Sequence, residues 1–143
     1  MNKKIYSLIF AFLILSMCLC FAGCSDRRVE DDIWKNATYS EDVQLGDGDT
    51  CVVVEVSAKD KSVTFTINTD KETLGDAMLE HSLISGEKGA YGLYVKFVNG
   101  IEADYDKTKS FWAISKDGQS LLTGVDGEKI SDGNKYEIVY TQQ

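Results

Sequence analysis

The chain has 143 residues, a formal net charge of −8 at pH 7, one histidine, four cysteines and no proline. This length supports one folded domain, and a hydrophobic content of 43% excludes a wholly disordered chain. The acidic balance argues against a nucleic-acid-binding protein, which needs clustered lysine and arginine, and a single histidine excludes a histidine-rich metal site.

The first 23 residues are typical of a secretory signal. A short basic start precedes an apolar run, residues 5–21, that contains no acidic residue. The run ends in Phe-Ala-Gly-Cys at positions 21–24, which resembles the lipobox of bacterial lipoproteins, although an aliphatic residue is commoner than Phe at its first position. We therefore predict acylation of Cys24 and anchoring in the outer face of the cell membrane. A retained membrane-spanning helix is the alternative.

Cleavage at the lipobox would leave one cysteine without lipid. Cys18 and Cys20 belong to the apolar run, so only Cys51 would keep a free thiol. The mature chain would then hold neither an internal disulfide nor a cysteine-based zinc site. We expect Cys51 to be a small buried residue at the start of a strand, with a reactive thiol as the alternative.

Residues 24–50 are predicted to be an acidic tether between the lipid anchor and the folded domain. The segment holds eight acidic residues against three basic ones and ends in Gly-Asp-Gly-Asp at positions 46–49. Such a composition buries too little apolar surface to order itself. Trp34 and Tyr39 are exceptions, and either could dock on the domain.

From Cys51 onward, apolar and polar residues alternate as in β-strands. The alternation runs through residues 52–57 and again through 63–68, which predicts a hairpin with one face toward a core. Thr73 is then expected to be the N-cap of a short helix, because an acidic residue follows three positions later. One face of this helix has residues at helical spacing: Leu74, Ala77, Met78 and His81.

Strand patterns return in the second half of the chain. Residues 92–98 are predicted to form a strand with the odd-numbered positions on its core face, and Asn99-Gly100 predicts a two-residue hairpin turn. Further strands are expected at 110–114 and 135–141. Residues 51–143 are therefore predicted to form an α+β domain, β-grasp-like, with a small mixed sheet packed on one short helix.

Three blocks of the sequence carry a resemblance to a known family. They are TLGDAMLEHSLISG at residues 73–86, YGLYVKFVNGIEADY at 91–105, and a later group with TGVD at 123–126, DG at 132–133 and YEIVY at 136–140. Together they resemble the bacterial domain family related to the C-terminal domain of transcobalamin and intrinsic factor. The resemblance covers roughly residues 52–141, and Phe111 departs from it, since Tyr is common at that position.

The resemblance implies a binding role that needs a second protein. In the animal proteins this domain covers one face of cobalamin, and a separate helical domain supplies the other half of the cavity. No helical domain of that kind is predicted here, so a corrinoid role follows only by analogy with the family. The resemblance gives His81 no metal-binding role, because any cobalt ligand of the animal proteins lies outside this domain.

Acidic pairs are the candidate metal ligands: Asp104 with Asp106, and Asp126 with Asp132. Calcium prefers six to eight oxygen ligands, usually from a dense Asp/Asn/Gly loop, whereas these residues are scattered, so we favour solvated turns. No catalytic signature accompanies them, since the sequence has no nucleophile elbow and His81 lies at the apolar spacing of its helix. An enzyme is not expected, and no cofactor is required.

Aromatic residues crowd the second half of the chain. Tyr94 alternates with the predicted core positions, and Tyr91 and Tyr105 flank turns, so all three are expected to be exposed. With Trp112, they are predicted to line a contact surface for a planar, partly apolar ligand or a protein partner. The alternative is that the larger aromatic residues simply fill the core: Trp112, Tyr136 and Tyr140.

The sequence thus predicts a membrane-anchored extracytoplasmic lipoprotein with one non-catalytic binding domain. The leading hypothesis is that it captures a cobalamin-like corrinoid or presents it to a membrane transporter or a helical partner subunit. A partner is expected because the domain alone would cover too little of such a ligand. The alternatives are a surface module that binds a protein and no small molecule, and a divalent-metal-binding domain. No nucleic-acid partner is expected.

Overall fold

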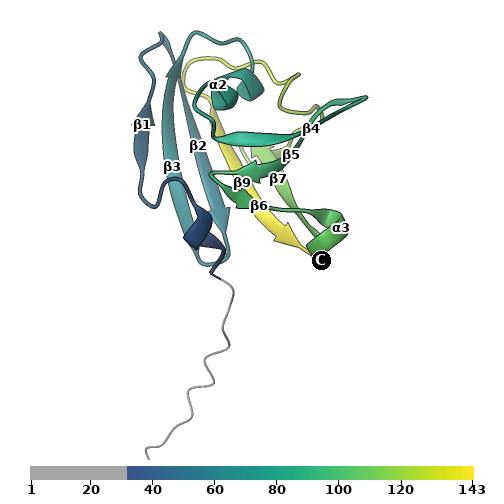
Figure 1. Ribbon diagram of the computed structural model, residues 1–143. Coiled ribbons are helices and arrows are strands. Elements are labelled where there is room, and N and C mark those ends of the chain that lie inside the picture. The colour runs from purple at the N-terminus through teal and green to yellow at the C-terminus, as the bar shows by residue number, and fades with distance from the viewer. Residues whose placement is uncertain (1–31) are drawn as a thin grey trace, which may run out of the picture. The chain divides into compact units, whose positions relative to one another are not determined.

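The structure, a computed structural model, describes residues 32–143. The predicted signal, the lipobox with Cys24 and the first part of the predicted tether lie outside the described residues. Within residues 32–143 the fold is α+β, as predicted, and consists of two sheets with short helices (Figure 1). None of the helices in this part of the chain has the length and apolar character needed to cross a bilayer.

The larger sheet has six strands in the order β1-β3-β2-β9-β7-β8. These strands are β1 (Val43–Leu45), β2 (Thr50–Ala58), β3 (Lys61–Thr69), β7 (Ser110–Lys116), β8 (Gln119–Ser120) and β9 (Lys135–Gln142). The sheet is mixed, because β1 runs parallel to β3 and β2 runs parallel to β9, whereas the other neighbours are antiparallel.

A second sheet of three strands lies against the larger one, so the prediction of a single small sheet was wrong. Its strands are β4 (Ile84–Gly89), β5 (Gly92–Val98) and β6 (Ile101–Glu102), in the order β4-β5-β6. Three short helices complete the fold: the 3-10 helix η1 (Ile33–Asn36), α2 (Leu74–Glu80) and α3 (Tyr105–Thr108). Figure 1 shows the smaller sheet beside β9 and β7, with α2 above it.

The hairpin and the helix of the first half are confirmed. β2 and β3 pair antiparallel with Val54 opposite Phe65, and both of these side chains are fully buried. The hydroxyl of Thr73 accepts a hydrogen bond from the backbone N–H of Asp76 at 3.2 Å, which is the predicted N-cap. Three of the four residues on the predicted helix face are buried: Leu74, Ala77 and Met78. Cys51 lies at the start of β2, as expected, but is only half-buried.

The prediction of a tether as far as residue 50 was wrong for residues 32–50, which belong to the folded unit. The indole N–H of Trp34 donates to the carbonyl of Ala58 at 2.9 Å, and the ring of Tyr39 packs edge-on against Phe65. The carboxylate of Asp42 accepts a hydrogen bond from the backbone N–H of Thr64 at 2.8 Å. Acidic residues in this segment therefore satisfy backbone groups of the sheet edge instead of keeping the segment solvated.

The predicted core face of β5 changes along the strand. Leu93 and Val95 are half-buried, but Phe97 is exposed and its neighbour Val98 is fully buried. The pairing with β4 shifts at this point, since Gly86 lies opposite Val95 and the preceding residue lies opposite Phe97. The shift leaves one residue of β5 without an opposite partner on β4. Beyond that residue, the positions expected to face the core are exposed, and those expected to be exposed face the core.

Candidate binding groove

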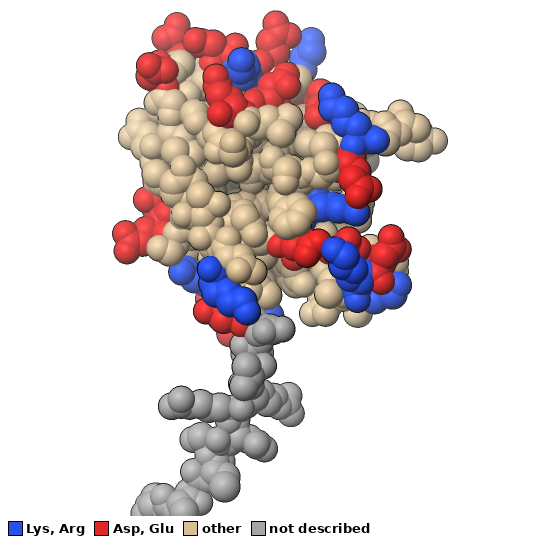
Figure 2. All heavy atoms as spheres, viewed as in Figure 1, with Lys and Arg blue, Asp and Glu red and all other residues tan. Residues whose placement is uncertain are grey.

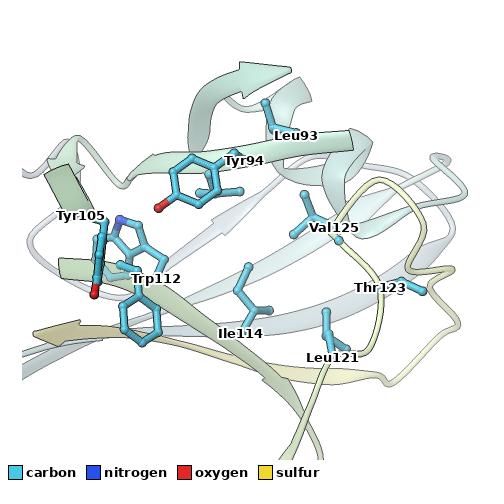
Figure 3. A pocket seen from close by; sticks show the side chains of 11 residues that line it. Leu93, Tyr94, Tyr105, Trp112, Ile114, Leu121, Thr123 and Val125 are labelled. Atoms are coloured by element: carbon cyan, nitrogen blue, oxygen red, sulfur yellow. The ribbon is translucent and has the colours of Figure 1, made fainter. Parts of the chain in front are cut away.

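An uncharged groove of about 370 Å³ lies between the two sheets (Figure 3). β5 forms one side, β7 and α3 form the floor and one end, and the loop after β8 forms the other end. The lining residues are Leu93, Tyr94, Val95, Tyr105, Phe111, Trp112, Ile114, Leu121, Thr123, Gly124 and Val125. None of these residues is Asp, Glu, His, Lys or Arg, so the groove suits an apolar or aromatic group.

Trp112 is a fixed part of the groove floor. Its side chain lies on β7 and is 7% exposed, and its indole N–H donates to the carbonyl of Lys96 on β5 at 3.3 Å. The ring also packs edge-on against Tyr140 of β9, with 5.5 Å between the ring centroids. Trp112 therefore joins the two sheets, and its side chain belongs to the core and also lines the groove.

Tyr94 and Tyr105 flank the groove and remain accessible, with 47% and 42% of their surface exposed. Tyr105 begins α3, and its hydroxyl donates to the amide oxygen of Gln143 at 3.3 Å. The ammonium of Lys109 lies 4.7 Å from the centroid of the Tyr105 ring, a cation–π contact. The ring is therefore held at the groove rim by contacts on its edge and on one face.

Asp104 holds the turn that carries Tyr105. Its buried carboxylate accepts hydrogen bonds from the backbone N–H groups of Asp106 and Lys107, at 3.0 and 3.2 Å, and so caps α3. Lys96 and Lys107 each lie 3.6 Å from the same carboxylate. The hydrogen bond from Lys107 N–H is the main cause that lowers the pKa of Asp104, and burial partly opposes it.

The loop of residues 121–125 closes the other end of the groove, and it was not named as a site from the sequence. The carbonyl of Val125 accepts a hydrogen bond from Gly75 N–H at 2.9 Å, and the carboxylate of Asp126 accepts one from Leu93 N–H at 3.0 Å. These bonds tie the loop to α2 and β5. TGVD at 123–126 was noted only as part of the family resemblance, and Phe111 only as a departure from it.

Tyr91 lies outside the groove. It occupies the turn between β4 and β5 and is 99% exposed, so the predicted exposure is seen, but its side chain does not line the groove. The structure thus brings Tyr94, Tyr105 and Trp112 together and places Tyr91 at the hairpin tip.

The candidate metal ligands are not gathered into one site. Asp126 is bonded to Leu93 N–H, and Asp132 accepts a hydrogen bond from Cys51 N–H at 2.8 Å. Asp104 caps α3, with Asp106 in the same turn. In residues 32–143, no three His, Cys, Asp or Glu side chains are grouped so that they could hold a metal ion. Three of these carboxylates, those of Asp104, Asp126 and Asp132, accept hydrogen bonds from backbone N–H groups at turns and strand ends.

Charged side chains are concentrated away from the middle of the face shown in Figure 2. Acidic and basic groups gather around the periphery of this face, at the top, the bottom and the right edge, and its centre is mostly uncharged. Electrostatics on this face therefore act at its periphery, and apolar contact dominates at its centre.

Comparison with known proteins places the groove in a recognised domain. A family model described as a domain of unknown function, DUF4430, matches residues 71–142, which include every residue that lines the groove. The chain belongs to the DUF4430 family. No curated protein matches the sequence.

Two solved structures resemble this DUF4430 domain. A candidate metal-binding protein from Ruminococcus gnavus ATCC 29149 is 30% identical, with a TM-score of 0.63, and the match covers 66% of this chain and 99% of that protein. Haptocorrin in complex with Cbi is 15% identical, with a TM-score of 0.52, and the match covers 65% of this chain and a quarter of haptocorrin. The predicted resemblance to the transcobalamin-related domain family is thereby confirmed at the level of the fold.

Proposed function

We propose that this DUF4430 domain is a non-catalytic binding module and that the groove is its recognition site. The observation that carries the proposal is the groove itself, which is uncharged and accessible and is lined by aromatic side chains from both sheets. Hydrogen bonds and ring contacts already fix Trp112 and Tyr105. A ligand would therefore meet a preformed surface and lose little affinity to the ordering of side chains.

A corrinoid is the small molecule with the best support as a ligand. Haptocorrin, which shares the fold, was solved with Cbi bound. A volume of about 370 Å³ lies at the lower end of the range for small-molecule sites, about 300–1,000 Å³, so the groove would cover one part of such a ligand. A membrane transporter or a helical partner subunit would cover the rest.

The proposed location is the outer face of the cell membrane. Acylation of Cys24 would fix the chain to the bilayer, and the folded unit begins at Asp32, so few residues would separate it from the lipid. The domain would then work close to the membrane surface, where a transporter could receive its ligand.

The fold is proposed to be β-grasp-like. The hairpin β2–β3 precedes α2, and the last strand β9 inserts beside β2 in parallel, which gives the central order β3-β2-β9-β7. The β-grasp-like fold expected from the sequence has a helix after a hairpin and a central strand that runs parallel to one strand of that hairpin. The three-stranded sheet would then be an addition that forms one side of the groove.

Titration calorimetry of the full chain with dicyanocobinamide tests the proposed function. We expect binding with a dissociation constant in the micromolar range or weaker, and Tyr94→Ala should weaken it about tenfold, because it removes an aromatic contact in the groove. Leu122→Ala is the matched control, since Leu122 is fully exposed and does not line the groove. It should leave the binding heat unchanged.

A calcium arm tests metal binding, the second candidate, which the description of the Ruminococcus relative supports. Calcium chloride at millimolar concentration should leave the melting temperature of the chain unchanged if the groove is the recognition site, whereas a specific metal site would raise it. Corrinoid binding that Tyr94→Ala does not weaken would overturn the assignment of the groove.

A further inference from the structure

One edge of β7 is paired along its length and the other is largely open. β7 pairs with β9 from Ser110 to Lys116. On its other edge it pairs with β8 at Ser115 and Lys116 and accepts one further backbone hydrogen bond, from Leu121 N–H to the carbonyl of Ile114 at 3.0 Å. The chain then turns away into the groove wall. Within residues 32–143, no strand lies beside the first part of this edge.

The backbone of Trp112 faces the open edge. Successive residues of an antiparallel strand direct their N–H and C=O groups to opposite sides. The bond from Leu121 shows that Ile114 faces away from β9, so Trp112, two residues earlier, does so as well. Neither backbone group of Trp112 has a hydrogen-bond partner among the described residues. Two backbone groups of a residue that lines the groove therefore lack partners, which is unusual for a largely buried residue.

A positive charge lies at the end of this open edge. Lys109 directly precedes β7, and its ammonium packs over the ring of Tyr105 at the groove rim. No carboxylate of residues 32–143 forms an ion pair with Lys109, whereas nearby Lys96 and Lys107 are each paired with acids. An acidic group on a ligand would therefore find a complementary charge beside the groove.

We propose that an extended polypeptide segment docks in the groove as an added strand on β7, in the position that a longer β8 would occupy. Its backbone pairs with the N–H and C=O of Trp112, and an apolar side chain lies in the groove beside Tyr94. Because the added strand runs antiparallel to β7, its carboxyl side reaches Lys109, where an acidic residue is preferred. The inference rests on the groove being a recognition site and names a polypeptide as its occupant instead of a corrinoid.

The unpaired groups favour a polypeptide for a physical reason. A donor and an acceptor on one residue of a strand edge match the donor and acceptor of one residue on a neighbouring strand, at the fixed spacing of a sheet. A groove of about 370 Å³ has room for one large side chain of such a strand. Pairing would also satisfy two backbone groups that the free protein leaves without partners.

The test uses the full chain and a synthetic pentapeptide, acetylated and amidated, with phenylalanine at the centre, valine on each side, threonine first and glutamate last. Amide hydrogen exchange and NMR shifts of the Trp112 N–H are measured with and without peptide. We expect saturating peptide to slow exchange of this N–H roughly tenfold, because the group gains a hydrogen bond. An analogue N-methylated at the phenylalanine cannot pair and should bind more weakly.

Charge variants test the direction of the added strand. Lys109→Met should weaken peptide binding about threefold, the magnitude of an exposed ion pair. Lys135→Met is the matched control, because it removes the same charge from an exposed residue at the far end of β9. A peptide with glutamate first and threonine last should bind more weakly than the original and should be indifferent to Lys109→Met.

The outcomes separate this inference from the proposed function. Slowed exchange at Trp112 with the peptide supports the inference, with or without cobinamide binding. Cobinamide binding without a peptide effect overturns the polypeptide and leaves the proposed function standing. Equal binding by the N-methylated analogue shows apolar association without a strand and overturns the inference. If neither cobinamide nor the peptide binds at about 1 mM, the inference and the proposed function are overturned together.

Discussion

The half of the domain built from β2, β3 and α2 is closed, whereas the half built from β5, β7 and the loop after β8 is open. The inward side chains of the hairpin are at most 1% exposed, as are the three helix residues that pack on them. Around the groove, by contrast, Tyr94 and Tyr105 remain nearly half exposed, and the backbone of Trp112 has an unpaired edge.

The difference between the closed and open halves shows how one small domain can use some residues for stability and others for recognition. Complete burial of the inward apolar side chains in the first half contributes favourable hydrophobic free energy to folding. The second half keeps apolar surface accessible, which contributes less to folding but leaves contacts for a ligand. Substitutions in the two halves should therefore differ in size and in what they affect.

The largest effect is expected from Phe65→Ala in the closed half. Phe65 is fully buried on β3 and contacts the ring of Tyr39. Its removal leaves a cavity, so the free energy of unfolding should fall by about 3–5 kcal/mol. Denaturation with urea measures the loss, and Leu122→Ala, at a fully exposed position, should change the same quantity by less than about 0.5 kcal/mol. Similar losses for both variants would contradict the comparison.

The next effect concerns the contact between the N-terminal segment and the smaller sheet. Asn99 is fully buried in the β5–β6 turn, and its side-chain amide accepts from Tyr39 N–H at 2.9 Å and donates to Tyr39 C=O at 2.8 Å. Asn99→Ala would remove both bonds and place alanine at a φ of 51°, so we expect a loss of about 2–4 kcal/mol in urea denaturation.

Two variants separate the causes of that loss. Asn99→Gly removes the bonds without the backbone strain and should cost about 1 kcal/mol less than alanine. Asp117→Ala is the control for strain alone, since Asp117 has the same φ of 51° in an exposed turn. If Asn99→Ala costs no more than Asp117→Ala, the side chain of Asn99 does not hold the N-terminal segment.

Local signals explain which elements were predictable from the sequence. The hairpin β2–β3 and the helix α2 were found because alternation, helical spacing and a capping threonine all lie within a few residues. The Asn99-Gly100 turn was found for the same reason, since both residues adopt positive φ. Each of these elements is stabilised in the way that its own sequence indicates.

Elements formed by distant contacts were missed. β1 has only three residues in an acidic segment, and its pairing with β3 together with the Asp42–Thr64 bond stabilises it. β4 is rich in glycine and polar residues and becomes a strand because β5 pairs with it. The tether prediction failed for this reason, because composition describes a segment alone and not the surface against which it folds.

The groove was predictable only in part, for a related reason. Tyr94, Tyr105 and Trp112 were named because aromatic residues in strands and turns attract attention by themselves. Phe111, Leu121 and the loop around Gly124 were not named as site residues, since they become a site only when the fold places them opposite β5. Three of the four aspartates show the converse: the carboxylates of Asp104, Asp126 and Asp132 attract attention in the sequence but accept backbone hydrogen bonds at turns and strand ends in the structure.

The smallest effect is expected at Asp104, in the turn that positions Tyr105. Because its folded-state pKa lies below the ordinary value of 3.8, the charged form stabilises the fold fully above about pH 4, and this contribution is lost as the pH falls further. Asp104→Asn keeps a capping side chain but removes the charge, so its melting temperature should lie about 2–6 °C below wild type at pH 7. The difference should shrink as the pH falls through the folded-state pKa of Asp104. Asp106→Asn removes an equal charge from the same turn without touching the cap, so it should stay within about 1 °C of wild type at pH 7. A gap between Asp104→Asn and wild type that persists in acid would mean that packing of the carboxyl group, and not its charge, holds this side of the groove.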